Sequence, residues 1–220
     1  MRIALGVEYD GRDFHGWERQ RHARSVQTCI EQGLSKVANQ PVSTVCAGRT
    51  DARVHALAQV VHFDTQAQRN ERSWVLGANS NLPDDASILW AREVDESFHA
   101  RFSATARSYR YVILNRLVRP AALRGRVTWQ PLHLDELEMA SAAQLLLGEH
   151  DFSAFRASGC QAKSPVRTLR ELNVTRHGEY VVLHVSAKCI SAAHGQEYRW
   201  RADGNRAAQA AGAMGCAGVG

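Results

Sequence analysis

The order of hydrophobic patterns in the first 94 residues constrains the fold more than any other feature of the chain. Residues 2–10 alternate apolar and polar side chains, as a half-buried strand does, and residues 25–39 carry apolar side chains at helical spacing. Ser25 suits the start of this helix and Pro41 its end. Further patterns predict strands over 42–48, 58–65 and 87–94 and a helix over 71–83. The order β-α-β-β-α-β predicts an α+β, ferredoxin-like half.

A second, incomplete half follows from about residue 103. Its patterns predict a strand over 107–115, a helix over 134–150, and a hairpin over 169–188 that turns at His177 and Gly178. This half is one helix and one strand shorter than the first. We therefore expect three regions, namely an N-terminal α+β domain over 1–102, a partial C-terminal α+β domain over 103–187, and an aberrant, disordered tail over 188–220.

Composition restricts the class of protein. No apolar run approaches the about 20 residues that span a bilayer, and acidic residues stand in the N-terminus where a signal peptide would be apolar, so we expect a cytoplasmic protein without a membrane partner. The five cysteines are scattered without a C-x-x-C pair, and His55 and His62 are read as structural histidines, so no metal site is expected. A net charge of +5 with 24 arginines favours a polyanionic partner, although genome composition explains the arginines equally well.

The loop between the second and third predicted strands gathers Arg49, Thr50, Asp51 and His55. In one interpretation, Asp51 is a turn residue that accepts hydrogen bonds from nearby backbone N–H groups and pairs with Arg49. In the other, Asp51 is a nucleophile held at the sheet edge, and a nearby arginine keeps it ionised. Spacing alone leaves both interpretations open.

Four segments in the same order carry a resemblance to a known family. The loop AGRTDARVHALAQVVHF resembles the signature A-G-R-T-D-A-G-V-H of the bacterial tRNA pseudouridine synthase A family. The segments EYDGRDFHGWERQ, FHARFSATARSYRYVILN and DFSAFRASGCQAKSPVRTLRELNVTRHGEYVVLHV resemble its other motifs. The resemblance covers residue 1 to about residue 187. It implies a duplicated α+β fold, a homodimer, and isomerisation of uridine to pseudouridine on the 3′ side of the tRNA anticodon stem-loop, without a metal or nucleotide cofactor.

The same resemblance implies roles for individual residues. Asp51 matches the catalytic aspartate, Tyr109 the aromatic residue that packs on the target base, and Arg49 the arginine linked to base flipping. Flipping a base out of a stem costs roughly a few kcal/mol, which an aromatic ring and a guanidinium offset by stacking. Residues that match tRNA-contacting stretches are Phe98, His99, Arg101, Phe102, Cys160, Gln161 and Lys163.

Several of these residue types also have ordinary structural roles. A strand tyrosine such as Tyr109 is more often a packing residue, and we expect Phe14 and Trp17 to lie in the core. Arg19, Arg21 and Arg24 form either an RNA-facing patch or a solvated turn.

The chain departs from the family pattern at Arg53, where the family has glycine. A glycine in such a place indicates positive φ or close approach of another backbone, and an arginine there is strained by about 1–3 kcal/mol. We expect this strain to displace the nucleophile.

A second departure begins after Ala187. Read in the frame shifted by one base, the codons of residues 194–200 can encode M-V-R-N-I-V-G, which resembles a family motif. We therefore expect a one-base insertion near the codon of Lys188, and sequencing the gene tests this: an uninterrupted frame that cannot encode the motif would refute it. Two alternatives to an active enzyme follow, a noncatalytic tRNA-binding remnant and an inactive pseudogene product.

Overall fold

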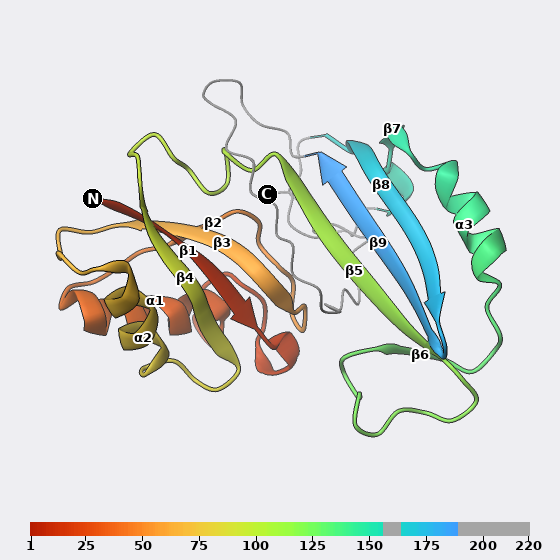
Figure 1. Cartoon of the computed structure of the whole chain (residues 1–220), viewed down its shortest axis with the longest axis horizontal. Helices are drawn as coiled ribbons and strands as arrows, with labels where there is room; N and C mark the ends of the chain where they lie inside the picture. Colours follow the sequence, from red (N-terminus) through yellow and green to blue (C-terminus); the bar gives the residue numbers. More distant parts are fainter. Residues whose placement is uncertain (156–163, 189–220) are drawn as a thin grey trace. The chain divides into compact units, whose positions relative to one another are not determined.

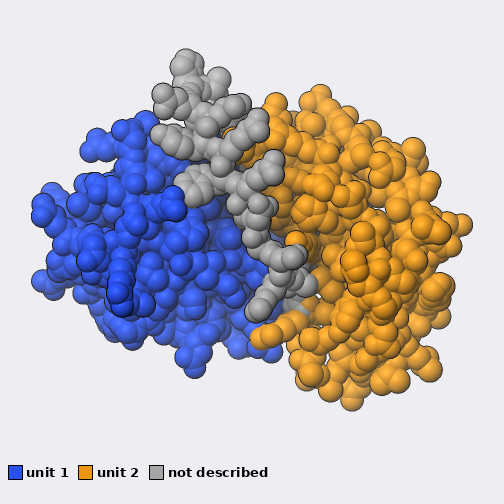
Figure 2. All heavy atoms as spheres, in the orientation of Figure 1, with its two compact units in different colours: residues 1–104, 191–205 blue, residues 105–190, 206–220 orange. Residues whose placement is uncertain are grey.

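The computed structural model describes residues 1–155 and 164–188, and it divides into two compact units (Figure 2). The described part of the first unit is Met1–Ala104, and the second unit begins at Thr105. The tail predicted over 188–220 lies, except for Lys188, outside the described residues. No helix among the described residues is long and apolar enough to cross a membrane.

The first unit is a four-stranded antiparallel sheet whose strand order is β2-β3-β1-β4 (Figure 1). The predicted order of elements is confirmed. The elements are β1 (Arg2–Tyr9), η1 (Gly11–Asp13), α1 (Val26–Ala38), β2 (Val45–Cys46), β3 (Ala56–Asp64), α2 (Glu71–Asn79) and β4 (Ala86–Val94).

Helices α1 and α2 cover one face of this sheet (Figure 1). Ser25 caps α1 as predicted, because its side chain accepts a hydrogen bond from the Thr28 backbone N–H. The apolar stripe of α1 and the inward side chains of β1 belong to one core together with Trp17 and Trp74, both almost fully buried. Burial of this apolar surface is the main force that holds the helices on the sheet.

The segment that follows β4 covers part of the opposite face of the sheet. Phe98 and Ala100 pack with Ala4 of β1 in a second, smaller core. Trp90 lies over Gly6, where a methyl group would collide with the indole ring. This face therefore carries a chain segment in place of a helix, and side chains of that segment reach solvent.

The second unit is a five-stranded sheet in the order β6-β5-β9-β8-β7, in which β5 and β6 are parallel and the other neighbours antiparallel. Its elements are β5 (Ala106–Asn115), β6 (Thr128–Gln130), α3 (Glu136–Gln144), β7 (Gly148–Asp151), η2 (Ser153–Phe155), β8 (Val166–His177) and β9 (Tyr180–Lys188). The predicted hairpin is present, but its turn is at Gly178 and Glu179, one residue later than expected.

Two predicted elements are shorter than expected. The strand over 42–48 reduces to two residues because residues before it bind side chains of α1: Val42 N donates to Ser35 Oγ and Thr44 N to Glu31 Oε1. The helix over 134–150 ends at Gln144. Gly148 has a φ of 94°, which no α-helix contains, and the residues from there pair with β8 as a strand.

Candidate active site

The loop that contains Asp51 is fastened to the segment after β1. Trp17 N donates to Thr50 O at 2.9 Å, and the hydroxyls of Tyr9 and Thr50 are 2.7 Å apart. Arg53 N donates to Phe14 O at 3.2 Å. The side chains of Tyr9, Phe14 and Trp17 are buried, and the Tyr9 ring contacts the rings of both Phe14 and Trp17, which confirms the core placement of these two residues. The loop therefore rests on the main core of the first unit.

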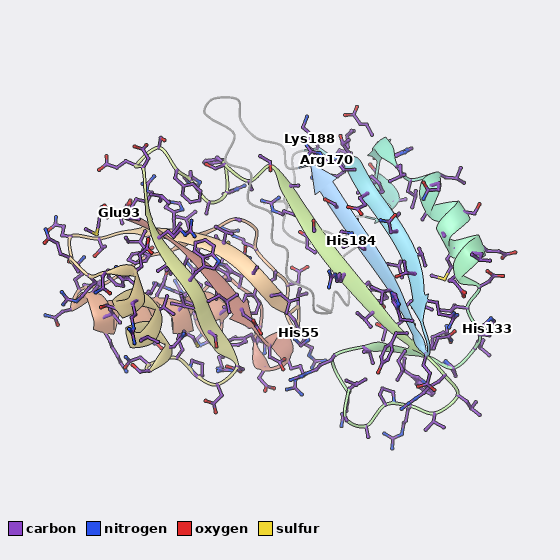
Figure 3. All side chains as sticks on the ribbon, viewed as in Figure 1. His55, Glu93, His133, Arg170, His184 and Lys188 are labelled. Atoms are coloured by element: carbon purple, nitrogen blue, oxygen red, sulfur yellow. The ribbon has the colours of Figure 1, made fainter. Side chains whose placement is uncertain are left out.

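Two glycines allow this close fit of backbone against backbone. A Cβ at Gly11 would lie 2.1 Å from Val54 O, and a Cβ at Gly16 would lie 2.8 Å from Thr50 O. Gly16 also has a φ of 99°, which other residues rarely adopt. His55, labelled in Figure 3, closes the far end of the loop, where Gly11 N donates to its Nδ1 at 3.3 Å. His55 is thus held as a structural histidine, as expected.

Asp51 is exposed at the tip of this loop. Desolvation by its surroundings raises the pKa of its carboxyl group above the usual value. Within residues 1–155 and 164–188, Asp51 makes no salt bridge. The guanidinium of Arg49 instead contacts Glu18, with Nη2 2.9 Å from Oε1. The pairing of Asp51 with Arg49, which the first interpretation of the loop included, is therefore absent from this conformation.

Arg53 has a φ of 67°, in the left-handed region. This confirms the positive φ that the family glycine indicated, and it means that an arginine occupies a conformation that favours glycine. Its side chain is exposed, so the strain is one of backbone conformation and involves no crowding of the side chain.

The segment 95–104 is organised by Arg2. Its guanidinium holds Asp64 with two hydrogen bonds of 2.8 Å, and it donates to the backbone carbonyls of Glu96 and Phe98, the latter at 2.8 Å. The pKa of Asp64 is lowered by this hydrogen bonding. Sequence reasoning missed Arg2 because nothing near residue 2 signals a partner almost a hundred residues away.

The predicted tRNA-contacting residues of this segment differ in exposure. Arg101 and Phe102 are exposed, His99 is half-buried, and Phe98 is 6% exposed. Any contribution of Phe98 to binding is therefore indirect in this conformation, through the position of its neighbours. Cys160, Gln161 and Lys163 lie outside the described residues.

Tyr109 lies on β5 in the second unit, where it is half-buried and pairs in register with Val185 of β9. Asp51 and Tyr109 thus belong to different units.

The three arginines considered for a patch have unequal surroundings. Arg24 makes two hydrogen bonds to Asp85, at 2.6 and 2.7 Å, and lies over the Phe14 ring at 4.2 Å. Arg19 donates to the buried carboxylate of Glu31. Arg24 and Arg19 therefore have structural partners, and Arg21 is exposed.

Comparisons with known proteins agree with these features. A sequence profile described as tRNA pseudouridine synthase matches residues 6–103 and 142–190, which include the Asp51 loop and the segment 95–103. The match ends close to residue 187, where the resemblance was expected to end. The tRNA pseudouridine synthase A of Nitrosococcus oceani is 58% identical over 190 residues, which cover 86% of this chain and 73% of the relative.

Two further relatives give the same result. The tRNA pseudouridine synthase A of Shewanella woodyi is 57% identical over 86% of this chain and 73% of its own length, and that of Photorhabdus laumondii is 54% identical over 86% and 72%. A profile that matches most of the chain and relatives that are more than half identical lead to one conclusion: the chain belongs to the tRNA pseudouridine synthase family, a family of isomerases.

Proposed function

We propose that this protein converts uridine to pseudouridine on the 3′ side of the tRNA anticodon stem-loop and that Asp51 is the nucleophile. The observation that carries the proposal is the setting of Asp51: an exposed carboxylate on a loop that is fastened to the core by Trp17, Tyr9 and Phe14. A reacting group must be held in one place for efficient catalysis. Membership of the family supplies the class of reaction.

The reaction needs only a nucleophile that bonds to the target nucleotide and is released again. The Asp51 carboxylate forms a bond to the target nucleotide, the N1–C1′ bond breaks, and the detached uracil turns so that C5 bonds to C1′. C5 then loses its proton while N1 gains one, and the carboxylate departs, so atoms and electrons balance without a cofactor. A uracil within a stem has to be flipped out before it can reach Asp51.

Arg49 and Tyr109 are proposed to assist this flipping. Arg49 stands two residues before Asp51 in the sequence, and its ion-pair partner within the part of the chain that the structure describes, Glu18, is an exposed carboxylate. Exposed pairs contribute about 0–1 kcal/mol, so a phosphate or an unstacked base can displace Glu18 at little cost. Tyr109 offers a half-buried aromatic ring on a strand, which is a suitable surface for a flipped base.

The resemblance also leads us to propose a homodimer, and the sequence patterns lead us to propose a cytoplasmic location and two ferredoxin-like halves, the second of them incomplete. The strand order β2-β3-β1-β4 in the first unit supports the last of these.

A tRNA-binding protein without isomerase activity is the second candidate. Two observations favour it: Arg53 occupies a position that suits glycine, and Asp51 lacks a basic partner among the residues that the structure describes.

Release of tritium from tRNA labelled at uridine C5 separates the two candidates, because this hydrogen is lost only when the base is reattached through carbon. We expect release by the protein as it stands and none above background by Asp51→Asn, with tRNA affinity retained in both. Binding without release by the unsubstituted protein would favour the second candidate.

A further inference from the structure

A buried carboxylate on α1 binds both of the segments that support the Asp51 loop. Glu31 is 3% exposed, and a glutamate is rarely so buried in a protein unless it is paired. Its Oε1 accepts hydrogen bonds from Thr44 N at 2.8 Å, from Thr44 Oγ1 at 3.1 Å and from Gln27 Nε2 at 3.0 Å. Its Oε2 pairs with the guanidinium of Arg19. Both oxygen atoms of this carboxylate therefore have donors as partners.

The first of these segments leads into the loop. Thr44 is 5% exposed and immediately precedes β2, and the loop that contains Asp51 follows directly after β2. Gln27 adds a second bond to Thr44, because its Nε2 also donates to Thr44 O at 3.2 Å. Glu31 and Gln27 thus hold both the backbone N–H and the backbone carbonyl of Thr44.

The second segment contacts the loop itself. Trp17 N donates to Thr50 O, and Trp17 O accepts a hydrogen bond from Gln27 N at 3.0 Å. Arg19 N donates to Gln27 Oε1 at 3.2 Å, and the Arg19 guanidinium binds Glu31. This segment is therefore attached to α1 through its backbone and through the side chain of Arg19.

Stability alone does not explain a charged residue at position 31. A buried ion pair contributes little net stability, because the cost of removing both charges from water offsets their attraction. An apolar side chain of similar size would fill the same space, but it could bind neither Thr44 N nor Arg19. The contacts of Glu31 therefore indicate a role in holding its partners in place.

We propose that Glu31 is a positioning residue that sets the place of Asp51 by holding both segments at once. The proposal rests on the proposed function for its reaction and adds a buried residue that acts through the loop. The segment that Arg19 attaches to α1 also contains Glu18, the partner of Arg49. A shift of a reacting group by about 1 Å is enough to slow catalysis about a hundredfold.

Glu31→Gln tests the proposal with a side chain of the same size. The amide oxygen can still accept from the donors at Oε1, but the amide NH2 group then faces the Arg19 guanidinium, and the ion pair is lost. We expect kcat for pseudouridine formation to fall about 10- to 100-fold, and the Kd for tRNA to stay within about twofold. Thermal unfolding shows that the variant is folded at the assay temperature, so unfolded protein does not account for the loss.

Hydrogen exchange of the loop gives a readout that does not depend on activity. Arg53 N donates to Phe14 O and Val54 N donates to Asp51 O, both at 3.2 Å. In Glu31→Gln these amides should exchange about tenfold faster, because the loop opens more often. Mass spectrometry of the peptide that covers residues 47–55 measures this rate, and the amides of α2 should exchange as in the parent.

Ser35→Ala is the matched control on the same helix. Ser35 Oγ accepts a hydrogen bond from Val42 N at 2.9 Å, so this variant also removes a bond between α1 and the chain before β2. It should leave kcat and the exchange of the loop at the parent values. Arg19→Gln should lower kcat in the parent but have no further effect in Glu31→Gln, because the two residues share one interaction.

Parent-like kcat in folded Glu31→Gln would overturn the proposal, and so would parent-like exchange of the loop. An equal loss in Ser35→Ala would also contradict it, since any bond between α1 and the chain before β2 would then have the same effect. If Glu31→Gln does not fold, Arg19→Gln replaces it in both measurements, and parent-like values there would overturn the proposal.

The proposed function is tested separately by tritium release from the unsubstituted protein. If that protein releases no tritium, the isomerase is refuted, and the exchange measurement still decides whether Glu31 holds the loop. Release by the unsubstituted protein together with parent-like kcat in Glu31→Gln would support the isomerase and refute the role of Glu31.

Discussion

The two units bury their helices to different extents. In the first unit, the apolar stripe of α1 is fully buried at Val26, Ile30 and Leu34. In the second unit, Ala143 is the one buried residue of α3, and Leu137 is 77% exposed. The N-terminus of α3 is nevertheless capped, because the Asp135 side chain accepts hydrogen bonds from two backbone N–H groups.

This difference indicates what holds each helix in place. Helix α1 is held by the hydrophobic core, whereas α3 is held largely by its cap and by Arg176 of β8, which donates to Glu136 at 2.7 Å. Exposed ion pairs and caps each contribute about 1 kcal/mol, and burial of a leucine contributes more. We therefore expect the first unit, which carries the Asp51 loop, to be the more stable of the two.

The comparison is tested most strongly by removing one leucine from each unit. Leu34→Ala should lower the free energy of unfolding of the first unit by about 2–5 kcal/mol, because it leaves a cavity in a close-packed core. Leu183→Ala on β9, where the side chain is half-buried, should cost the second unit less than about 1.5 kcal/mol. Hydrogen exchange read by mass spectrometry resolves the two units. An equal or larger loss for Leu183→Ala would contradict the comparison.

Substitution of one glycine in each unit compares a tightly packed loop with an open turn. Gly16→Ala combines positive φ with a clash against Thr50 O and should cost about 1–3 kcal/mol and reduce catalysis by shifting the Asp51 loop. Gly178→Ala, in the hairpin of the second unit, has φ +60° with no atom within 4 Å and should cost only about 1 kcal/mol. Denaturant unfolding and tritium release give both results. Unchanged catalysis in a folded Gly16→Ala would show that the loop is not positioned by this contact.

The pH dependence of catalysis reports the surroundings of Asp51. Desolvation raises the pKa of this carboxyl group, and the nucleophile must be ionised. Activity should therefore rise about tenfold per pH unit below this pKa, and the rise should end at a higher pH than the ordinary pKa of an aspartate would give. A profile of kcat/KM against pH measures this pKa as the midpoint of the acid side of the curve. A midpoint at or below the ordinary pKa of aspartate would contradict the desolvation.

The smallest effect is expected at Arg53. Arg53→Gly removes left-handed strain of about 1–2 kcal/mol but adds freedom to the unfolded chain that costs about 0.5–1 kcal/mol. The melting temperature should therefore rise slightly or stay unchanged. Arg53→Val, which is β-branched, should lower it clearly, and equal melting temperatures for Gly and Val would argue against strain at this position.

Sequence patterns were most informative where one face of an element is buried. The stripe of α1 predicted this helix correctly because the helix buries one face in the core, and the alternation of β1 predicted this strand correctly although the segment after β4 also covers its other face at Ala4. The same reasoning extended α3 through Leu145–Leu147 to residue 150, because those leucines resemble a buried stripe although Leu145 is exposed. The short strands β6 and β7 were missed because their few residues give no periodicity.

The motif predicted the site residues, but it did not predict the contacts that hold them in place. The motif located Asp51, and the family glycine correctly indicated positive φ at Arg53. The contacts of Arg2 with residues 96 and 98, and of Glu18 with Arg49, join positions that sequence spacing does not relate. Long-range hydrogen bonds of this kind depend on the fold as a whole, so a single sequence does not reveal them.

Tritium release from C5-labelled tRNA, measured side by side for the unsubstituted protein and Asp51→Asn, tests the central claim most directly. If Asp51 is the nucleophile, the unsubstituted protein releases tritium in step with pseudouridine formation, and Asp51→Asn binds the same tRNA without release above background. Release by Asp51→Asn at a rate similar to that of the unsubstituted protein would contradict the assignment.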